Sequence, residues 1–282
     1  MRLSLLAVMS ALAIVASACG GDSDEGTSGG SPDDTGDAAG ESGSPVYGGN
    51  VVYGLEAENS GGWCLPEGQL AISGIQVARA IYDTLTAPNE DGDYVPFLAE
   101  SVEPNEDFTE WTVTLQDGVT FHDGTALTAE VVKNNLDAYR GEYAARQPLL
   151  LRFIFEPVAA VDVVDDTTLT IRTSIPWPAL PAALYSNGRA GIVAQAQLDD
   201  AETCDTNLIG TGPFVLDEWV VNDHLSASRN PDYWGTDSEG NQLPYLDSIE
   251  FRPVGDPVTK ANAVLSGDLD MAHGSGGATT SI

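Results

Sequence analysis

The chain has 282 residues, of which 42% are hydrophobic, so it is long enough for one or two domains with a substantial core. Its 43 Asp and Glu residues outnumber its 11 Lys and Arg residues, which gives a formal net charge of -32 at pH 7. This charge argues against a nucleic-acid-binding protein and against electrostatic binding to anionic lipid, because both require a basic surface.

The first 18 residues are typical of an export signal. A basic start at Arg2 precedes an apolar stretch over residues 3–16, which only two serines interrupt. At about 14 residues the stretch is shorter than the roughly 20 that a membrane-spanning helix needs, and it suits a signal peptide. Small residues then precede Cys19 in a pattern that resembles a bacterial lipobox, so we expect a signal peptide over 1–18 and a lipid on Cys19. The alternative is an ordinary secretory signal with an incidental cysteine.

Residues 19–45 have the composition of a flexible linker. They are rich in Gly, Ser, Asp and Thr, and they contain no aromatic and no basic residue. Such a segment cannot bury enough apolar surface to offset the chain entropy that is lost on ordering. We therefore expect a lipidated, disordered and acidic tether between a membrane anchor and a folded domain.

From residue 46 onward, short apolar runs between turn residues predict strands. Turn residues at 117–118 and 165–166 predict two hairpins, the first of which joins residues 111–115 to residues 119–121. The expected strands cover residues 50–55, 111–115, 119–121, 158–164, 168–172, 214–221, 224–229 and 249–252.

Capping residues and apolar stripes predict the helices. Ser73 and Thr128 are each expected to cap one helix, and a short helix is expected within residues 176–184. Asp256 followed by Pro257 marks the start of a last helix, whose apolar side comprises Val258, Ala261, Val264 and Leu265. The mixture of helices with short antiparallel strand pairs predicts an α/β fold of the mixed α+β type, without a doubly wound sheet.

Several blocks of sequence between residues 47 and 272 occur in an order that is specific for one known family. The blocks are ARAIYDTL (78–85), VPFLAES (95–101), WTVTLQDGVTFHDG (111–124), LTAEVV (127–132), GTGPF (210–214), RNPDYW (229–234) and LSGDLD (265–270). Together they resemble the extracytoplasmic solute-binding proteins of the peptide and nickel ABC-importer family, called family 5. The blocks say little about which ligand is bound.

The resemblance implies a periplasmic-binding-protein-like fold of type II, in which two lobes close over a ligand. Residues 46–85 and 193–268 are expected to form the main subdomain of the first lobe, and residues 86–192 its second subdomain. Family members are typically around twice as long as this chain. The resemblance therefore implies the N-terminal lobe only, with the second lobe missing and residues 269–282 as its truncated start.

The resemblance also places ligand contacts on two loops. Glu56, Asn59 and Trp63 follow the first predicted strand, where the family has ligand contacts, although Trp63 can instead cover a disulfide. Asn187 and Arg189 lie on a segment that the family fold brings to the cleft. Arg189 is expected to meet a ligand carboxylate or, alternatively, to pair with a surface acid.

Two cysteines of the exported part, Cys64 and Cys204, belong to one subdomain in the family fold, which implies a disulfide between them. The alternative is two buried free thiols. The three histidines are too scattered for a metal cluster, so we expect neither a metal nor a cofactor.

The function that the resemblance implies is the substrate-binding component of an ABC importer. Such a protein captures oligopeptides or similar small solutes outside the membrane and delivers them to permease subunits. We expect a monomer without enzymatic activity and without a nucleic-acid partner, held by its lipid at the outer face of the cytoplasmic membrane. The alternatives are a non-transporting surface lipoprotein or scaffold and, from the many carboxylates, an exported glycan hydrolase.

Overall fold

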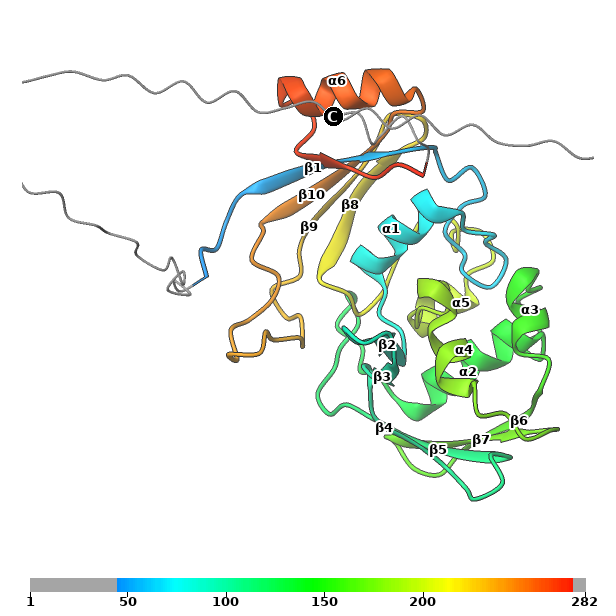
Figure 1. Ribbon diagram of the computed structural model, residues 1–282. Coiled ribbons are helices and arrows are strands. Elements are labelled where there is room, and N and C mark those ends of the chain that lie inside the picture. The colour runs from blue at the N-terminus through cyan, green and yellow to red at the C-terminus, as the bar shows by residue number, and fades with distance from the viewer. Residues whose placement is uncertain (1–44, 276–282) are drawn as a thin grey trace, which may run out of the picture. The chain divides into compact units, whose positions relative to one another are not determined.

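A computed structural model describes residues 45–275 of the chain (Figure 1). The predicted signal peptide, Cys19 and nearly all of the predicted tether lie outside the described residues, as does the end of the range 269–282. Within residues 45–275, no helix has both the length and the apolar character that crossing a membrane requires.

The described part contains eleven strands and six α-helices in mixed order. The strands are β1 (Asn50–Leu55), β2 (Thr86–Pro88), β3 (Tyr94–Pro96), β4 (Ala99–Pro104), β5 (Glu110–Leu115), β6 (Val158–Val163), β7 (Thr168–Thr173), β8 (Phe214–Val220), β9 (His224–Arg229), β10 (Ser248–Pro253) and β11 (Met271–Ala272). The helices are α1 (Ile72–Ile81), α2 (Ala129–Arg140), α3 (Leu150–Ile154), α4 (Leu180–Tyr185), α5 (Gln195–Asp199) and α6 (Pro257–Ser266), with a 3-10 turn η1 (Ser186–Gly188). The mixed α/β class predicted from the sequence is confirmed.

A five-stranded sheet has the strand order β11-β1-β10-β9-β8. Strand β1 runs parallel to both β10 and β11, and Tyr53 of β1 lies opposite Phe251 of β10. Figure 1 shows α1 and α6 on opposite sides of this sheet. Strand β11 falls in the range that was expected to start the second lobe, yet it extends the first sheet next to β1.

A second sheet is antiparallel and has the order β4-β5-β7-β6. The β6–β7 hairpin confirms one of the two predicted hairpins. The other is wrong, because both edges of β5 are occupied by β4 and β7. Residues 119–121 form no strand, and Thr120 bridges only to Ala126.

Local caps explain where the longer helices begin. The Thr128 hydroxyl accepts a hydrogen bond from Val131 N at 3.3 Å in α2, and Asp256 accepts one from Thr259 N at 2.8 Å in α6, as the sequence predicts. The predicted cap at Ser73 is wrong. Helix α1 already begins at Ile72, and the buried Ser73 hydroxyl instead accepts a hydrogen bond from Ala57 N at 3.2 Å.

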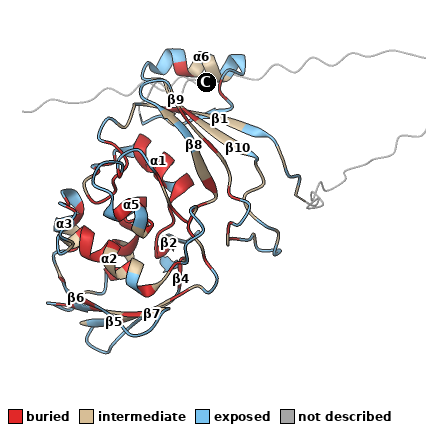
Figure 2. Cartoon of the chain, turned by 180° about the vertical axis from the view of Figure 1, so that it is seen from behind, coloured by how far each residue is buried: buried red, intermediate tan, exposed pale blue. Residues whose placement is uncertain are grey.

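The hydrophobic core lies between the two sheets and around the helices that fill this space. Figure 2 shows α1 and α2 largely buried, whereas α6 is mostly exposed. The predicted apolar side of α6 is therefore not a core face: Val258 is 63% exposed and Leu265 71% exposed, while Lys260 is only 3% exposed. One continuous cluster of buried side chains connects both sheets. The division of the lobe into two subdomains stays a prediction.

Candidate functional site

The carboxyl ends of the parallel strands β1, β10 and β11 meet at one edge of the five-stranded sheet. Ligands of open α/β sheets bind outside the carboxyl ends of their strands. Four polar side chains gather at this edge: Glu56 follows β1, Lys260 lies in α6 after β10, and His273 and Ser275 follow β11. We call these four residues the carboxyl-edge cluster.

Glu56 is the centre of the carboxyl-edge cluster. Its carboxylate accepts a hydrogen bond from Ser275 Oγ at 2.8 Å, and it lies 4.0 Å from Lys260 Nζ and 3.7 Å from His273 Nε2. The hydrogen bonds from Ser275 lower the pKa of Glu56 most, and the charge of Lys260 adds to this, as does His273 where its imidazole is protonated. Glu56 therefore carries a negative charge at neutral pH.

Lys260 and His273 are the two basic residues of the carboxyl-edge cluster, and both are largely buried. The Lys260 stem is buried over Gly54, where an added Cβ would lie 3.6 Å from Lys260 Cδ and 2.6 Å from Leu269 Cδ1. Burial lowers the pKa of His273, so its imidazole is neutral at pH 7. Both ring nitrogens of His273 are buried and make no hydrogen bond within residues 45–275. The imidazole thus retains unused hydrogen-bonding capacity next to a carboxylate.

The order of the groups in the cluster is not that of a nucleophilic triad. In a Ser–His–acid triad the imidazole lies between the serine and the acid. Here Ser275 Oγ donates a hydrogen bond directly to the Glu56 carboxylate, and His273 Nε2 lies 3.7 Å from the same carboxylate. The imidazole therefore does not link the serine to the acid. The arrangement suits the binding of a polar solute better than the activation of a serine.

The other predicted contacts on the loop after β1 have structural partners. Asn59 Nδ2 donates to Gly62 O at 2.7 Å and so closes the loop on itself. Trp63 is only 1% exposed, and its ring lies edge-on to Trp219 with 5.7 Å between the centroids. This burial supports the alternative that Trp63 covers the disulfide, and a ligand contact of Trp63 stays a prediction.

The predicted contacts on the second segment lie in and after η1. Asn187 is exposed and has left-handed backbone with φ 57°. Arg189 Nε donates a hydrogen bond to Leu70 O at 2.9 Å. Arg189 forms no ion pair with any residue of 45–275, so the alternative of a surface ion pair is wrong for this part of the chain. No hydrogen bond or ion pair of the described residues joins this segment to Glu56.

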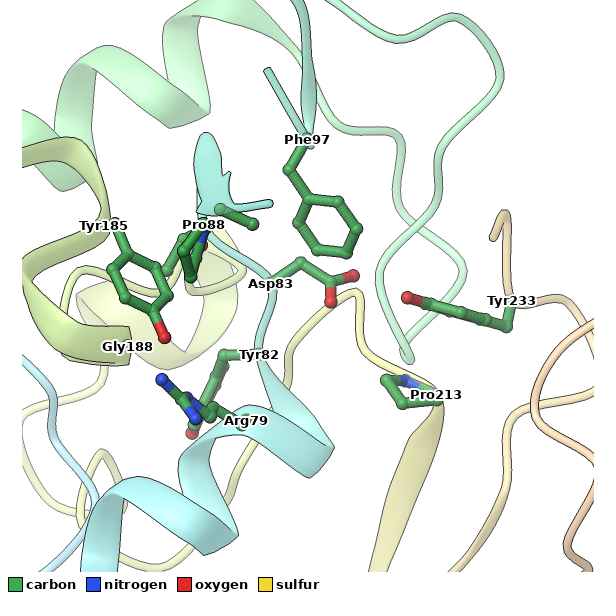
Figure 3. A pocket seen from close by; sticks show the side chains of 11 residues that line it. Arg79, Tyr82, Asp83, Pro88, Phe97, Tyr185, Gly188, Pro213 and Tyr233 are labelled. Atoms are coloured by element: carbon green, nitrogen blue, oxygen red, sulfur yellow. The ribbon is translucent and has the colours of Figure 1, made fainter. Parts of the chain in front are cut away.

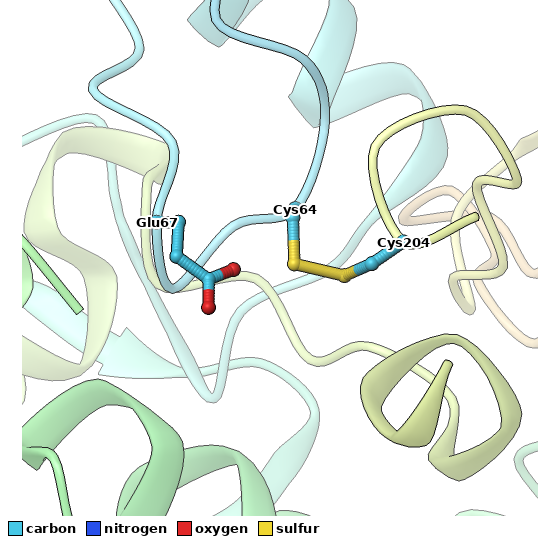
Figure 4. A group of neighbouring side chains, drawn as sticks. All are labelled: Cys64, Glu67 and Cys204. Carbon is cyan, nitrogen blue, oxygen red and sulfur yellow. A yellow bond between two sulfur atoms is a disulfide. The ribbon is translucent and has the colours of Figure 1, made fainter. Parts of the chain in front are cut away.

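A disulfide joins Cys64 to Cys204 with an S–S distance of 2.03 Å (Figure 4). It connects the β1–α1 loop to the segment after α5, and Cys64 N also donates to Asp205 Oδ1 at 3.2 Å. Glu67 lies beside the two sulfurs. Thiolates bind metals, whereas these sulfurs are bonded to each other, so the group is a covalent link and not a metal site.

Sequence reasoning missed Lys260, His273 and Ser275. Lys260 lies in the predicted last helix but outside its predicted apolar side, and His273 is one of the three scattered histidines. The signal that was present is their position after two strands that run parallel to β1, because such positions share one edge of a sheet. The parallel pairing itself depends on contacts between distant residues and was not predicted.

The sheet order and the helices on both sides of it define one lobe of a type II periplasmic binding protein. Residues 93–281 match the family described as bacterial extracellular solute-binding proteins, family 5 Middle. The chain therefore belongs to solute-binding protein family 5, as its sequence blocks predict.

Three proteins illustrate the similarity. The glutathione-binding protein GsiB of Escherichia coli O157:H7 is 32% identical over 197 residues, which cover 70% of this chain and 37% of GsiB. The structure of AgaA from A. tumefaciens R10 with agropinic acid has a TM-score of 0.68 at 27% identity, over 78% of this chain and 43% of AgaA. The oligopeptide-binding protein AppA from Bacillus subtilis with a nonapeptide shares the fold, with a TM-score of 0.68 at 21% identity over 80% of this chain and 44% of AppA. The chain thus spans 37% of the length of curated relatives such as GsiB.

Proposed function

We propose that the chain is the substrate-binding component of an ABC importer, which captures oligopeptides or similar small solutes outside the cytoplasmic membrane and delivers them to permease subunits. The observation that carries the proposal is the carboxyl-edge cluster, because it lies where open α/β sheets bind ligands. Membership of solute-binding family 5 supports the same role.

The chemistry of the cluster fits the polar groups of such solutes. The ionised Glu56 carboxylate accepts hydrogen bonds from an ammonium group or from amide N–H donors of a solute. The neutral His273 ring adds one donor and one acceptor beside it. The named solutes of the similar proteins are glutathione, a nonapeptide and agropinic acid, which supports a class of small polar solutes and not one compound. Asn59, Asn187 and Arg189 remain proposed contacts of this solute.

Export and anchoring belong to the same proposal. The apolar stretch before Cys19 supports export and lipid attachment at the outer face of the cytoplasmic membrane. A monomeric folded part belongs to the same proposal. We expect metabolic labelling with a fatty-acid analogue to mark the protein. The Cys19→Ala variant should lose the label and appear in the medium, and unchanged membrane retention of this variant would contradict the anchor.

Solute binding is tested by calorimetric titration of the full 282-residue chain with glutathione and with trialanine. We expect a measurable affinity for at least one of the two peptides, and we expect Glu56→Gln to weaken it about tenfold, the effect of losing one charge-assisted hydrogen bond. The matched control is Glu218→Gln. It removes an exposed carboxylate of β8, the strand at the other end of the sheet order from β11 and β1. Absence of binding for both peptides, or an equal effect of both variants, would refute a peptide site at Glu56.

A further inference from the structure

A cavity of about 220 Å³ lies at the carboxyl end of α1, away from the carboxyl-edge cluster and with no residue in common with it. Its wall combines residues of α1, β2, α4 and η1 with residues outside the helices and strands, among them Pro213 just before β8. Figure 3 shows Arg79 beside Tyr185 at one end, and Asp83 with Phe97 and Tyr233 at the other. The cavity thus has one cationic end, one acidic end and aromatic rings at both ends.

The cation at one end has no acidic partner. The Arg79 guanidinium carbon lies 5.3 Å from the centroid of the Tyr185 ring. Arg79 forms no ion pair and no side-chain hydrogen bond with residues 45–275, although acids far outnumber bases in this chain and most described Lys and Arg side chains do pair with carboxylates. Its planar donor groups are therefore free to bind a carboxylate of a ligand in the cavity.

The acid at the other end has no cationic partner. Asp83 is 4% exposed, and its Oδ2 accepts hydrogen bonds from Thr211 Oγ1 at 3.1 Å and from Trp234 Nε1 at 3.0 Å. No Lys or Arg of residues 45–275 lies within ion-pair distance of this carboxylate. A buried acid without a compensating charge is costly, and an ammonium group at the same place removes part of that cost. Neutral donors alone hold Asp83 in the chain itself.

We propose that this cavity binds a small zwitterion, namely a free α-amino acid with an apolar side chain, whose carboxylate pairs with Arg79 and whose ammonium group hydrogen-bonds to Asp83. The aromatic rings of Phe97 and Tyr185 contact the apolar side chain. The volume of about 220 Å³ is of the size that one amino acid occupies. The inference goes beyond the proposed solute-binding function and does not depend on it.

The test titrates the full chain with L-leucine, and with two analogues that each lack one charge. Leucinamide keeps the ammonium group and N-acetyl-leucine keeps the carboxylate, so both should bind at least tenfold more weakly than leucine. Arg79→Gln should weaken leucine binding about 10- to 100-fold, because it removes a charge-assisted contact with the ligand carboxylate. Arg79 is exposed, and its side chain makes no ion pair and no hydrogen bond with residues 45–275, so we expect this variant to fold.

The matched control is Arg152→Gln on α3, which also removes an arginine without an ion pair within residues 45–275 but lies outside this cavity. We expect it to leave leucine binding unchanged. Amide chemical shifts locate the site: leucine should shift Thr84 and Gly188, which line the cavity. The proposal is overturned if leucine does not bind, if either analogue binds as well as leucine, if both arginine variants act alike, or if the shifts cluster around Gly54 instead.

Discussion

Burial of Asp83 makes the stability of the folded chain depend on pH in an unusual direction. Burial raises the pKa of Asp83 from 3.8 to about 6, and hydrogen bonds from Trp234, Thr211 and Tyr233 oppose that rise. Between these two pKa values the folded state therefore binds more protons than the unfolded state. Stability must then fall as the pH rises through this window, which is opposite to the usual effect of a salt-bridged aspartate.

The magnitude follows from the two pKa values of Asp83. One pKa unit corresponds to about 1.4 kcal/mol, so the rise from 3.8 to about 6 corresponds to about 3 kcal/mol at neutral pH. About 2.5 kcal/mol of this falls between pH 4 and pH 7. Asp83→Asn removes the titration while it keeps an oxygen that accepts hydrogen bonds from Thr211 and Trp234.

The assay is denaturant unfolding of the wild-type chain and of Asp83→Asn at several pH values between 4 and 7. The free energy of unfolding of the wild type minus that of the variant should decrease by about 2.5 kcal/mol across this range. His122 also has a lowered pKa, and its Nε2 lies 3.0 Å from the carbonyl oxygen of Gly212, the residue after Thr211. Because His122 is present in both proteins, its titration cancels when the two free energies of unfolding are subtracted. The Tyr233 hydroxyl has a raised pKa and does not titrate in this range.

The raised pKa of Asp83 would be refuted if the free energy of unfolding of the wild type minus that of Asp83→Asn stays constant or increases between pH 4 and pH 7. A second variant sharpens the test. Trp234→Phe removes a hydrogen bond that lowers the pKa of Asp83, so the decrease in stability should shift to higher pH. A shift to lower pH would show that the indole does not stabilise the ionised carboxylate.

Three further changes probe the parts that position the two sites. Replacing Cys64 and Cys204 together with serine should lower the free energy of unfolding by about 4–5 kcal/mol in the chain-entropy model, because the disulfide spans a sequence separation of 140, and denaturant unfolding measures it. Gly210→Ala should destabilise by more than about 3 kcal/mol or prevent folding, because an added Cβ would lie 1.9 Å from Ile81 O; soluble yield and circular dichroism report the outcome. Asp256→Ala should lower the stability by about 1 kcal/mol through loss of the α6 cap, measured by thermal unfolding.

Each of these changes has its own control. Reduction of the wild-type chain should reproduce the double serine variant, and full stability after reduction would contradict a structural disulfide. Gly61→Ala adds a Cβ with nothing within 4 Å, so it should leave the stability nearly unchanged, and an equal effect at both glycines would show that space is not the cause. Asp256→Asn keeps an acceptor at the cap and should retain most of the stability that Asp256→Ala loses.

Features that depend on residues close together in the chain could be predicted from the amino-acid sequence. The caps at Thr128 and Asp256 and the β6–β7 hairpin are of this kind, since each is decided by a few adjacent residues. The ordered sequence blocks also identified the family, and the family implied the pairing of Cys64 with Cys204 that the structure contains.

The contacts between distant segments of the chain, in contrast, became known only from the three-dimensional fold. Pairing of β5 with β4 and β7 excludes the local hairpin with residues 119–121, because one strand has only two edges. Parallel pairing of β1 with β10 and β11 brings Lys260 and His273 to Glu56, and it turns an apparently solvated lysine into a buried one. Likewise, Arg79 and Asp83 are close in sequence, but the cavity between them exists only because α4, η1 and the segment just before β8 pack around the end of α1. Such contacts depend on the free energy of the whole packed core, which no local pattern encodes.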